Sequence, residues 1–480
     1  MRRMSLLGML FLGAIAASAP VTAKVFLRVE PWPLPPADQT GIQDVVLLWP
    51  LRDLSVAAKL HSQGYRVFLQ CESKDLAAAV VTADRAAVAG MIVTGAAPRK
   101  QSPAAEPLRP YFAAHPSLTF RILVPGGKQP QMKGRLVVER DGVLQVSSPS
   151  SQPWLDTNLA LVRLAQSRDP ESVPILYDFH WDMSGALADA GNPDAEAYAL
   201  SMAEADAMRS DVAIDLPPSL QRALVADDPR AWTLWKAVMP YLDFSSHAPT
   251  ERVLPVVNLG VIVDDAQASY EAINLMARHN LAFESVRPSS LTSTRLASWN
   301  SVVVFCPLHQ EAVARLRKFA VGGGMVIFVS THDKLPWHSA APLRQESGRT
   351  VYSIGRGQVV ELAEPVVDPE NFARDLRRLI GKERSALGLW NSLTTLVTGY
   401  HEQSRPDITL YLVNYAEQPD NVQVQVKGRF TRVRWESPEE PCCVSLPFVQ
   451  RGGFTEFMIP ALRIAARVHL DSARESSEAP

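Results

Sequence analysis

Short apolar stretches of strand length alternate with helix-like segments through the first half of the chain, from about residue 44 to residue 247. This alternation is typical of parallel βα units. The predicted strands cover residues 44–49, 66–71, 90–94, 118–124, 135–138, 174–179, 211–215 and 241–244. Eight such strands fit a TIM-like (β/α) barrel. The spacing is tight, however, and residues 134–147 have a hairpin pattern around Asp141-Gly142, so we expect a reduced or irregular barrel.

A second α/β pattern begins near Arg252. Apolar runs at 256–263, 281–286, 301–305 and 325–330 are separated by helical segments, which predicts an open, doubly wound, flavodoxin-like domain. The glycines at 322–324 follow a helix and precede a strand, so they form a turn and not a dinucleotide-binding fingerprint. Residues 351–360 have a hairpin pattern, and residues 369–380 have a helical one.

The last part of the chain has the pattern of an antiparallel β-sandwich. Residues 408–415, 422–427, 430–435 and 454–459 alternate apolar and polar positions and are joined by short turns. The tail, 471–480, is polar and is predicted to be disordered.

The N-terminus has the three parts of a secretory signal peptide. Arg2 and Arg3 precede an apolar run at 5–17, and small residues lead up to Ala23, where we expect cleavage. The apolar run is shorter than the about 20 residues that a membrane span needs. We therefore expect export, to the periplasm or the exterior, and this order of domains: signal peptide 1–23, barrel 24–250, α/β domain 251–365, linker helix and sandwich 366–470, and tail 471–480.

Composition limits the classes of partner. The chain has 480 residues, of which 47% are hydrophobic, and its formal net charge is −2. It has enough apolar residues for about three cores and lacks the basic footprint of a nucleic-acid-binding or membrane-surface protein. We therefore predict a neutral partner, with no nucleic acid and no membrane span after signal cleavage.

The cysteines indicate neither a disulfide scaffold nor a metal site. Cys71, Cys306, Cys442 and Cys443 are scattered over the predicted domains, and one disulfide is feasible after export. No cysteine or histidine spacing is typical of zinc, and no cofactor motif is present, so we predict neither a metal nor a cofactor. Cys306 lies between Phe305 and Pro307, without the small neighbours of a nucleophile elbow, and we interpret it as structural.

Polar and aromatic residues end the predicted strand at 174–179. Alternation places Asp178, His180 and Asp182 on one face. In a parallel barrel this strand end lies at the mouth where such enzymes build their sites, and a mixture of acids and aromatic rings suits a sugar. Asp178 and Asp182 are about 13 Å apart in an extended chain, whereas a glycosidase needs two carboxyl groups at about 5 to 9.5 Å. Asp178 therefore needs a partner from another strand.

Other strand ends supply the remaining candidates. The predicted catalytic residues are Asp178, Asp182, Asp215 and Asp243, and the predicted substrate-binding residues are Glu72, Trp154, Asp156, Tyr177, His180, Trp181 and His247. Structural roles are an open alternative for each class. An Asp after a strand often caps the next helix, Asp156 fits the same role, and a lone His is more often structural.

Two segments resemble a known glycoside hydrolase. The run WNSVVVFCPLHQEAVARLRKFAVGGGMVIFVS at 299–330 and the run LYLVNYA at 410–416, within a barrel, α/β domain and sandwich, resemble family-42 β-galactosidases. The resemblance implies a carbohydrate partner, a glutamine-amidotransferase-like middle domain and homo-oligomer formation through that domain. The clan's Asn-Glu catalytic pair is absent, so no catalytic residue is carried over. Two functions stay open: a glycosidase that uses Asp carboxylates, or a catalytically inactive glycan-binding or scaffold protein.

Overall fold

A computed structural model describes residues 25–94, 109–124, 136–140, 143–147, 157–168, 175–179, 194–246, 253–264, 266–330, 334–346, 348–392, 394–402, 406–416 and 418–473. The predicted signal peptide lies outside these residues. None of the helices in these ranges is both long enough and apolar enough to cross a membrane.

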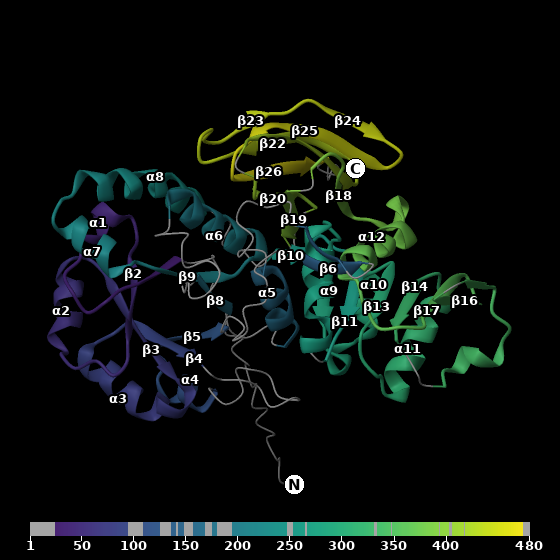
Figure 1. Ribbon diagram of the computed structural model, residues 1–480, viewed down its shortest axis with the longest axis horizontal. Helices are drawn as coiled ribbons and strands as arrows, with labels where there is room; N and C mark the ends of the chain where they lie inside the picture. The colour runs from purple at the N-terminus through teal and green to yellow at the C-terminus, as the bar shows by residue number, and fades with distance from the viewer. Residues whose placement is uncertain are drawn as a thin grey trace, which may run out of the picture.

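Parallel strands near the N-terminus of the described chain close into a barrel (Figure 1). In order around the barrel they are β1 (Val25–Arg28), β2 (Asp44–Leu48), β3 (Arg66–Glu72), β4 (Gly90–Thr94), β5 (Thr119–Val124), β8 (Ile175–Phe179) and β9 (Asp211–Asp215). β9 pairs with β1, and this pairing closes the ring. The helices of this part are α1 (Ala37–Thr40), α2 (Ser55–Ser62), α3 (Leu76–Ala86), α4 (Arg109–Ala114), α5 (Thr157–Arg168), α6 (Ala195–Met208), α7 (Pro218–Val225) and α8 (Pro229–Ser246).

Side chains fill the barrel interior in layers. Phe26, Val46, Phe68, Ile92, Leu123 and Ala213 form one apolar cluster inside the ring. Toward the amino ends of the strands, Arg121 Nε lies 2.7 Å from Asp211 Oδ2, and the side chain of Asp211 is fully buried. An ion pair at this end of a barrel has a structural role, since catalysis in such barrels takes place at the opposite end.

The barrel corrects two of the sequence predictions. β1 was not predicted, although it closes the ring. The strand predicted at 241–244 is wrong, because these residues form the last part of α8, where Val238, Tyr241, Leu242 and Ser245 are buried with helical spacing. The hairpin pattern is confirmed: β6 (Leu136–Arg140) pairs antiparallel with β7 (Val143–Ser147) and not with the barrel.

An open α/β sheet follows. In spatial order its described strands are β12 (Phe283–Val286), β11 (Leu259–Ile262), β13 (Ser301–Val304), β14 (Met325–Val329), β17 (Gly357–Leu362), β16 (Arg349–Ile354) and β15 (Arg344–Glu346). The strands from β12 to β17 run parallel in the order 2-1-3-4-5, which is the flavodoxin-like order. The helices are α9 (Ala266–Arg278), α10 (Ser293–Ser298), α11 (Gln310–Val321) and α12 (Pro369–Ile380). Gly323 turns the chain from α11 into β14 with a φ of +115°, as the glycine run predicted.

Two antiparallel sheets complete the chain. The large sheet has the order β10 (Val253–Pro255), β19 (Thr395–Glu402), β20 (Ile408–Asn414), β26 (Ala465–Ser472), β22 (Phe430–Glu436) and β23 (Val444–Ser445). The small sheet has the order β18 (Leu387–Leu389), β21 (Asp420–Lys427), β25 (Phe454–Leu462) and β24 (Phe448–Arg451). Side chains from both sheets form one apolar cluster between them, as expected for a sandwich. The predicted disordered tail begins too early, because β26 continues to Ser472 and Asp471 pairs with Arg434.

The sandwich lies over both other parts (Figure 1). Toward the barrel, Tyr415 Oη donates a hydrogen bond to Glu204 of α6, and Arg467 of β26 contacts Phe244 of α8. Toward the α/β sheet, the side chain of Asn280 bonds the backbone of β19. α6 is buried on every side from Ala197 to Met208, because the barrel, α8 and the sandwich surround it.

Candidate functional site

Three side chains meet at the carboxyl ends of the barrel strands. Arg28 ends β1, Gln70 lies near the end of β3 and Asp215 ends β9. Arg28 Nη1 donates to Asp215 Oδ1 at 2.7 Å, and Arg28 Nε donates to Gln70 Oε1 at 3.1 Å. Arg28 of β1 therefore links β9 on one side to β3 on the other at the barrel mouth. The side chains of Arg28 and Asp215 keep 12% and 18% of their surface exposed, so neither is completely buried.

Hydrogen bonds from Arg28 and Tyr198 hold Asp215 in a fixed position. The guanidinium of Arg28 holds one of its carboxylate oxygens at 2.7 Å. Behind it, Tyr198 Oη donates to the backbone oxygen of Asp215 at 2.8 Å. Burial, and secondly the charge of Asp215, raise the pKa of Tyr198, so its hydroxyl stays protonated. A carboxylate paired in this way suits a base, a nucleophile or a hydrogen-bond acceptor better than a proton donor.

Glu72 extends this cluster outward along β3. It is two residues beyond Gln70, so both side chains lie on the same face of the strand. Glu72 Oε2 pairs with Lys74 Nζ at 2.7 Å, and 60% of the Glu72 side chain is exposed. Its position matches the predicted substrate-binding role, which stays a prediction. Cys71, between Gln70 and Glu72, is buried on the opposite face, and burial raises the pKa of its thiol to about 11.

Asp178 and Tyr177 belong to β8. In register, Asp178 pairs with Ala213 of β9, and Tyr177 pairs with Val212. The backbone therefore places Asp178 one pair before the end of β8, beside the strand that carries Asp215. The predicted residues Trp154, Asp156, His180, Trp181, Asp182 and His247 lie outside the described residues.

Asp243 was predicted to be catalytic because it was expected to end a barrel strand, and the structure places it elsewhere. It lies on α8, exposed, and not at the end of a barrel strand. The next residue, Phe244, contacts Arg467 of the sandwich, so this part of α8 faces the sandwich. The error arose because a short apolar run has the same composition in a strand and in a helix.

Sequence reasoning did not find Arg28. The signal was weak: four residues, Val-Phe-Leu-Arg, precede a proline-rich segment and follow the predicted signal peptide. An arginine that ends a short apolar run is the only local sign, and its importance comes from the closing pair β9–β1.

Metal-ligand geometry does not occur at the mouth among the described residues. The one group of three His, Cys, Asp or Glu donors found in the described ranges is Glu436, Cys442 and Cys443, which lies in the sandwich. Cys442 and Cys443 form a disulfide, and Cys71 and Cys306 are free. Burial, and secondly the charge of Asp264, raise the pKa of Cys306 to about 12, which agrees with a structural thiol.

Comparisons with known proteins agree with this architecture at the level of fold. The sequence matches no protein-family model and no curated protein. The structure is similar to α-L-fucosidase isoenzyme 2 from Paenibacillus thiaminolyticus, with 12% identity, a TM-score of 0.60, and coverage of 94% of this chain and 100% of that one. Two β-galactosidases, from Rahnella sp. R3 and from the Antarctic haloarchaeon Halorubrum lacusprofundi, each show 10% identity, a TM-score of 0.53, and coverage of 94% and 99%.

The likeness spans nearly the whole of each chain, so it concerns the combination of domains and not the barrel alone. The chain therefore has a glycoside-hydrolase-like fold.

Proposed function

We propose that this chain is an exported glycoside-hydrolase-like protein that acts on a carbohydrate at the carboxyl-end mouth of its barrel. The observation that carries the proposal is the cluster of Arg28, Gln70 and Asp215 at this mouth. An arginine, an amide and a carboxylate offer donors and acceptors together, which is what a sugar's hydroxyl groups require. The whole-chain likeness to a fucosidase and to β-galactosidases supports the same substrate class.

In this proposal two aspartates have separate catalytic roles. Asp215, paired with Arg28 at 2.7 Å, acts as the base or nucleophile. Asp178, on the adjacent strand, acts as the second carboxyl group, with Asp182 as the alternative. A glycosidase needs such a pair on the two sides of the scissile bond.

A second function is favoured by two specific observations. The bond from Arg28 fixes one oxygen of Asp215, and the sequence has no Asn-Glu pair, so the same mouth could bind a glycan without cleaving it. In that case the Arg28–Asp215 pair provides hydrogen bonds to sugar hydroxyl groups and no proton transfer. Asp215→Asn would then weaken binding, and no rate would be measurable.

The test compares the wild type with Asp178→Asn and Asp215→Asn on a panel of aryl glycosides, with calorimetric titration of the corresponding free sugars. Asp375→Asn, an exposed change on α12, is the matched control. We expect a wild-type rate on at least one glycoside, a loss of about 10²-fold or more in both mouth variants, and no change in the control. Binding without hydrolysis, weakened by Asp215→Asn, would establish the second function. Equal rates and equal affinities in all four proteins would refute both.

The α/β part and the N-terminal segment are also given roles in this proposal. We propose that the α/β part is amidotransferase-like and mediates homo-oligomer formation, as the family-42 resemblance implies; its flavodoxin-like strand order supports this. Export is supported by the signal-peptide pattern before Ala23.

A further inference from the structure

Side chains with oxygen, sulfur and nitrogen atoms that can bind a metal ion lie together on one face of the large sheet, away from the barrel mouth. Glu436 of β22 pairs in register with Arg467 of β26, and Arg434 pairs with His469. On the other side of β22, Trp435 pairs with Val444 of β23. Cys443 is one residue before Val444, so it comes opposite Glu436 as the hairpin continues. Because cross-strand neighbours share a face, Cys443, Glu436 and His469 all lie on the same side of the sheet.

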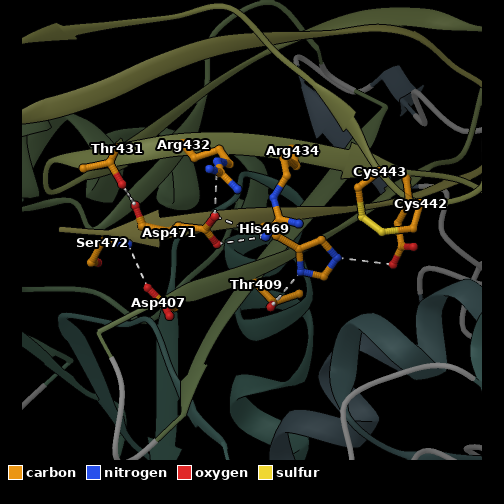
Figure 2. Close-up of polar contacts among 11 residues, drawn as sticks. Asp407, Thr409, Thr431, Arg432, Arg434, Cys442, Cys443, His469, Asp471 and Ser472 are labelled. Atoms are coloured by element: carbon orange, nitrogen blue, oxygen red, sulfur yellow. Dashed lines mark hydrogen bonds and ion pairs between the residues drawn. A yellow bond between two sulfur atoms is a disulfide. The ribbon is translucent and has the colours of Figure 1, made fainter. Parts of the chain in front are cut away.

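The donor atoms are close enough to share one ion. One carboxylate oxygen of Glu436 and the sulfurs of Cys442 and Cys443 lie within 4.8 Å of one another. His469 Nε2 lies 3.3 Å from Glu436 Oε1, and Figure 2 shows the His469 ring on the side of the sheet where the two cysteines lie. A tetrahedral zinc ion has bonds of about 2.0 to 2.3 Å, which places its ligands about 3.5 Å apart. The cluster therefore needs adjustments of about 1 Å.

We propose that Cys442 and Cys443, once reduced, form with Glu436 and His469 a binding site for a thiophilic divalent cation such as Zn²⁺. The structure contains the oxidised form, in which Cys442 and Cys443 are joined by a disulfide. Disulfide sulfurs are poor ligands, so the site is closed in this form and opens on reduction.

The opening step is thiol–disulfide exchange with a dithiol reductant. The reductant supplies two electrons and two protons, becomes a cyclic disulfide itself, and leaves two thiols on the protein. Binding of the cation then displaces the two protons, because the thiolate is the ligand. Cys442 is exposed and Cys443 half-buried, so both the reductant and the ion have access.

The charges around the cluster balance in the loaded state. Two thiolates and the Glu436 carboxylate contribute three negative charges, and the cation contributes two positive ones. Arg467 supplies the third positive charge, because its Nη1 lies 3.4 Å from Glu436 Oε1 and its side chain is only 2% exposed. Arg434, the other nearby cation, is paired with Asp471 at 3.1 Å. These charges sum to zero and Cys442 is exposed to solvent, which together limit the desolvation cost of the loaded site.

The surroundings also orient the donors. His469 Nδ1 lies 3.4 Å from Thr409 Oγ1, so the ring can donate to this hydroxyl while Nε2 faces the ion. The loop before the cysteines is fixed by Ser437, whose Oγ accepts bonds from the backbone N–H groups of Glu439 and Glu440. Tyr241 Oη of α8 donates to Glu439 Oε1 at 2.7 Å, which ties this loop to the barrel. These contacts reduce the ordering of the loop and of the imidazole ring that binding of the cation requires.

Sequence spacing could not indicate this site. Glu436 and His469 come from different strands and meet only through the register of β22 and β26. The expectation of no metal was drawn from the absence of spaced cysteine and histidine motifs, which find sites built on one local segment.

The test uses the full-length protein, reduced with dithiothreitol and then freed of it under anaerobic conditions. Zn²⁺ is titrated in competition with a chromophoric chelator, and Cd²⁺ is added separately because thiolate–cadmium bonds absorb in the ultraviolet. We expect one Zn²⁺ per reduced chain, the cadmium band, and no binding to the oxidised chain at the same concentration. Cys442→Ser/Cys443→Ser should lose both signals.

Two further comparisons separate the four-residue site from a bare dithiol. Glu436→Gln and His469→Gln should each weaken Zn²⁺ at least about tenfold, since even outer-shell changes cost 10- to 100-fold. The control is Cys71→Ala/Cys306→Ala, which removes the free thiols and should bind as the wild type does. Equal binding by the oxidised chain, loss of binding in this control, or unchanged affinity in both Glu436→Gln and His469→Gln would each overturn the proposal. If Glu436→Gln does not fold, His469→Gln and the cysteine double variant decide the question.

Discussion

Asp206 is a carboxyl group buried at the junction of α6 and the sandwich, and we predict that it makes the stability of the protein depend on pH. Its side chain lies in the fully buried part of α6. Burial raises the pKa of Asp206 from 3.8 to about 6, although Arg467, a hydrogen bond from Ser245 and Arg209 act in the opposite direction. The charged form is thus less favourable in the folded protein than in the unfolded chain.

The direction and the size of the pH effect on the free energy of unfolding follow from proton linkage. Between pH 3.8 and about pH 6 the folded protein keeps the Asp206 proton and the unfolded chain has lost it. The free energy of unfolding therefore falls as pH rises through this window. At about 1.4 kcal/mol per pKa unit, the loss from this one group is about 3 kcal/mol and is complete near pH 7. Asp206→Asn, which cannot ionise, removes the loss.

The assay is urea unfolding followed by tryptophan fluorescence, for the wild type and for Asp206→Asn, from pH 4 to pH 7.5. The free-energy difference between the two proteins should change by about 2 to 3 kcal/mol over this range, in favour of the variant at high pH. Other titrating groups cancel in the difference. Asp375→Asn, which removes an exposed charge on α12, should give a curve parallel to the wild type. Parallel curves for the wild type and Asp206→Asn would refute the reasoning.

Two substitutions and one mass measurement test the packing and the assembly of the chain. Asn280→Ala should destabilise the protein by about 2 to 4 kcal/mol in urea unfolding, because its side chain bonds the Thr395 oxygen at 2.9 Å and the Val397 nitrogen at 2.8 Å; a loss below about 0.5 kcal/mol would contradict this. Gly260→Ala should lower the free energy of unfolding by about 1 to 3 kcal/mol, because the added carbon would lie 2.3 Å from the Trp299 ring; an unchanged melting temperature would show that the ring moves freely. Light scattering after size exclusion should give an oligomer if the α/β part mediates association, and a monomer mass would exclude that proposal.

The sequence was informative where a hydrophobic pattern and a secondary-structure period agree. α12 was predicted at its observed bounds, since Asp368 caps it through the nitrogen of Asn371, Pro369 occupies its first turn and its apolar face is clear. The parallel strands of the α/β sheet were likewise predicted, because buried strands alternate with helices there. Local signals are sufficient for such elements.

Elements defined by distant partners were predicted less well. β1 is four residues long, and it closes the barrel because it pairs with β2 on one side and with β9, nearly two hundred positions later, on the other. At the candidate site, strand-end reasoning selected Asp215 and Glu72 but could not supply Arg28, which depends on β1. The proposed metal site depends in the same way on strand register, which composition and spacing do not reveal.

The position of β10 affects how the chain can be divided and how it is made. Val253–Pro255 pairs with Tyr400–Glu402 at the edge of the large sheet, so the sandwich begins before the α/β sheet and is completed after it. During synthesis, β10 leaves the ribosome about 150 residues before its partner and must wait for it while the α/β part folds. A fragment that starts at residue 366 would lack this strand and leave the backbone of β19 unpaired along one edge. Such an edge is a template for association between chains, so a sandwich for separate study should be cut before residue 253 and not after the α/β part.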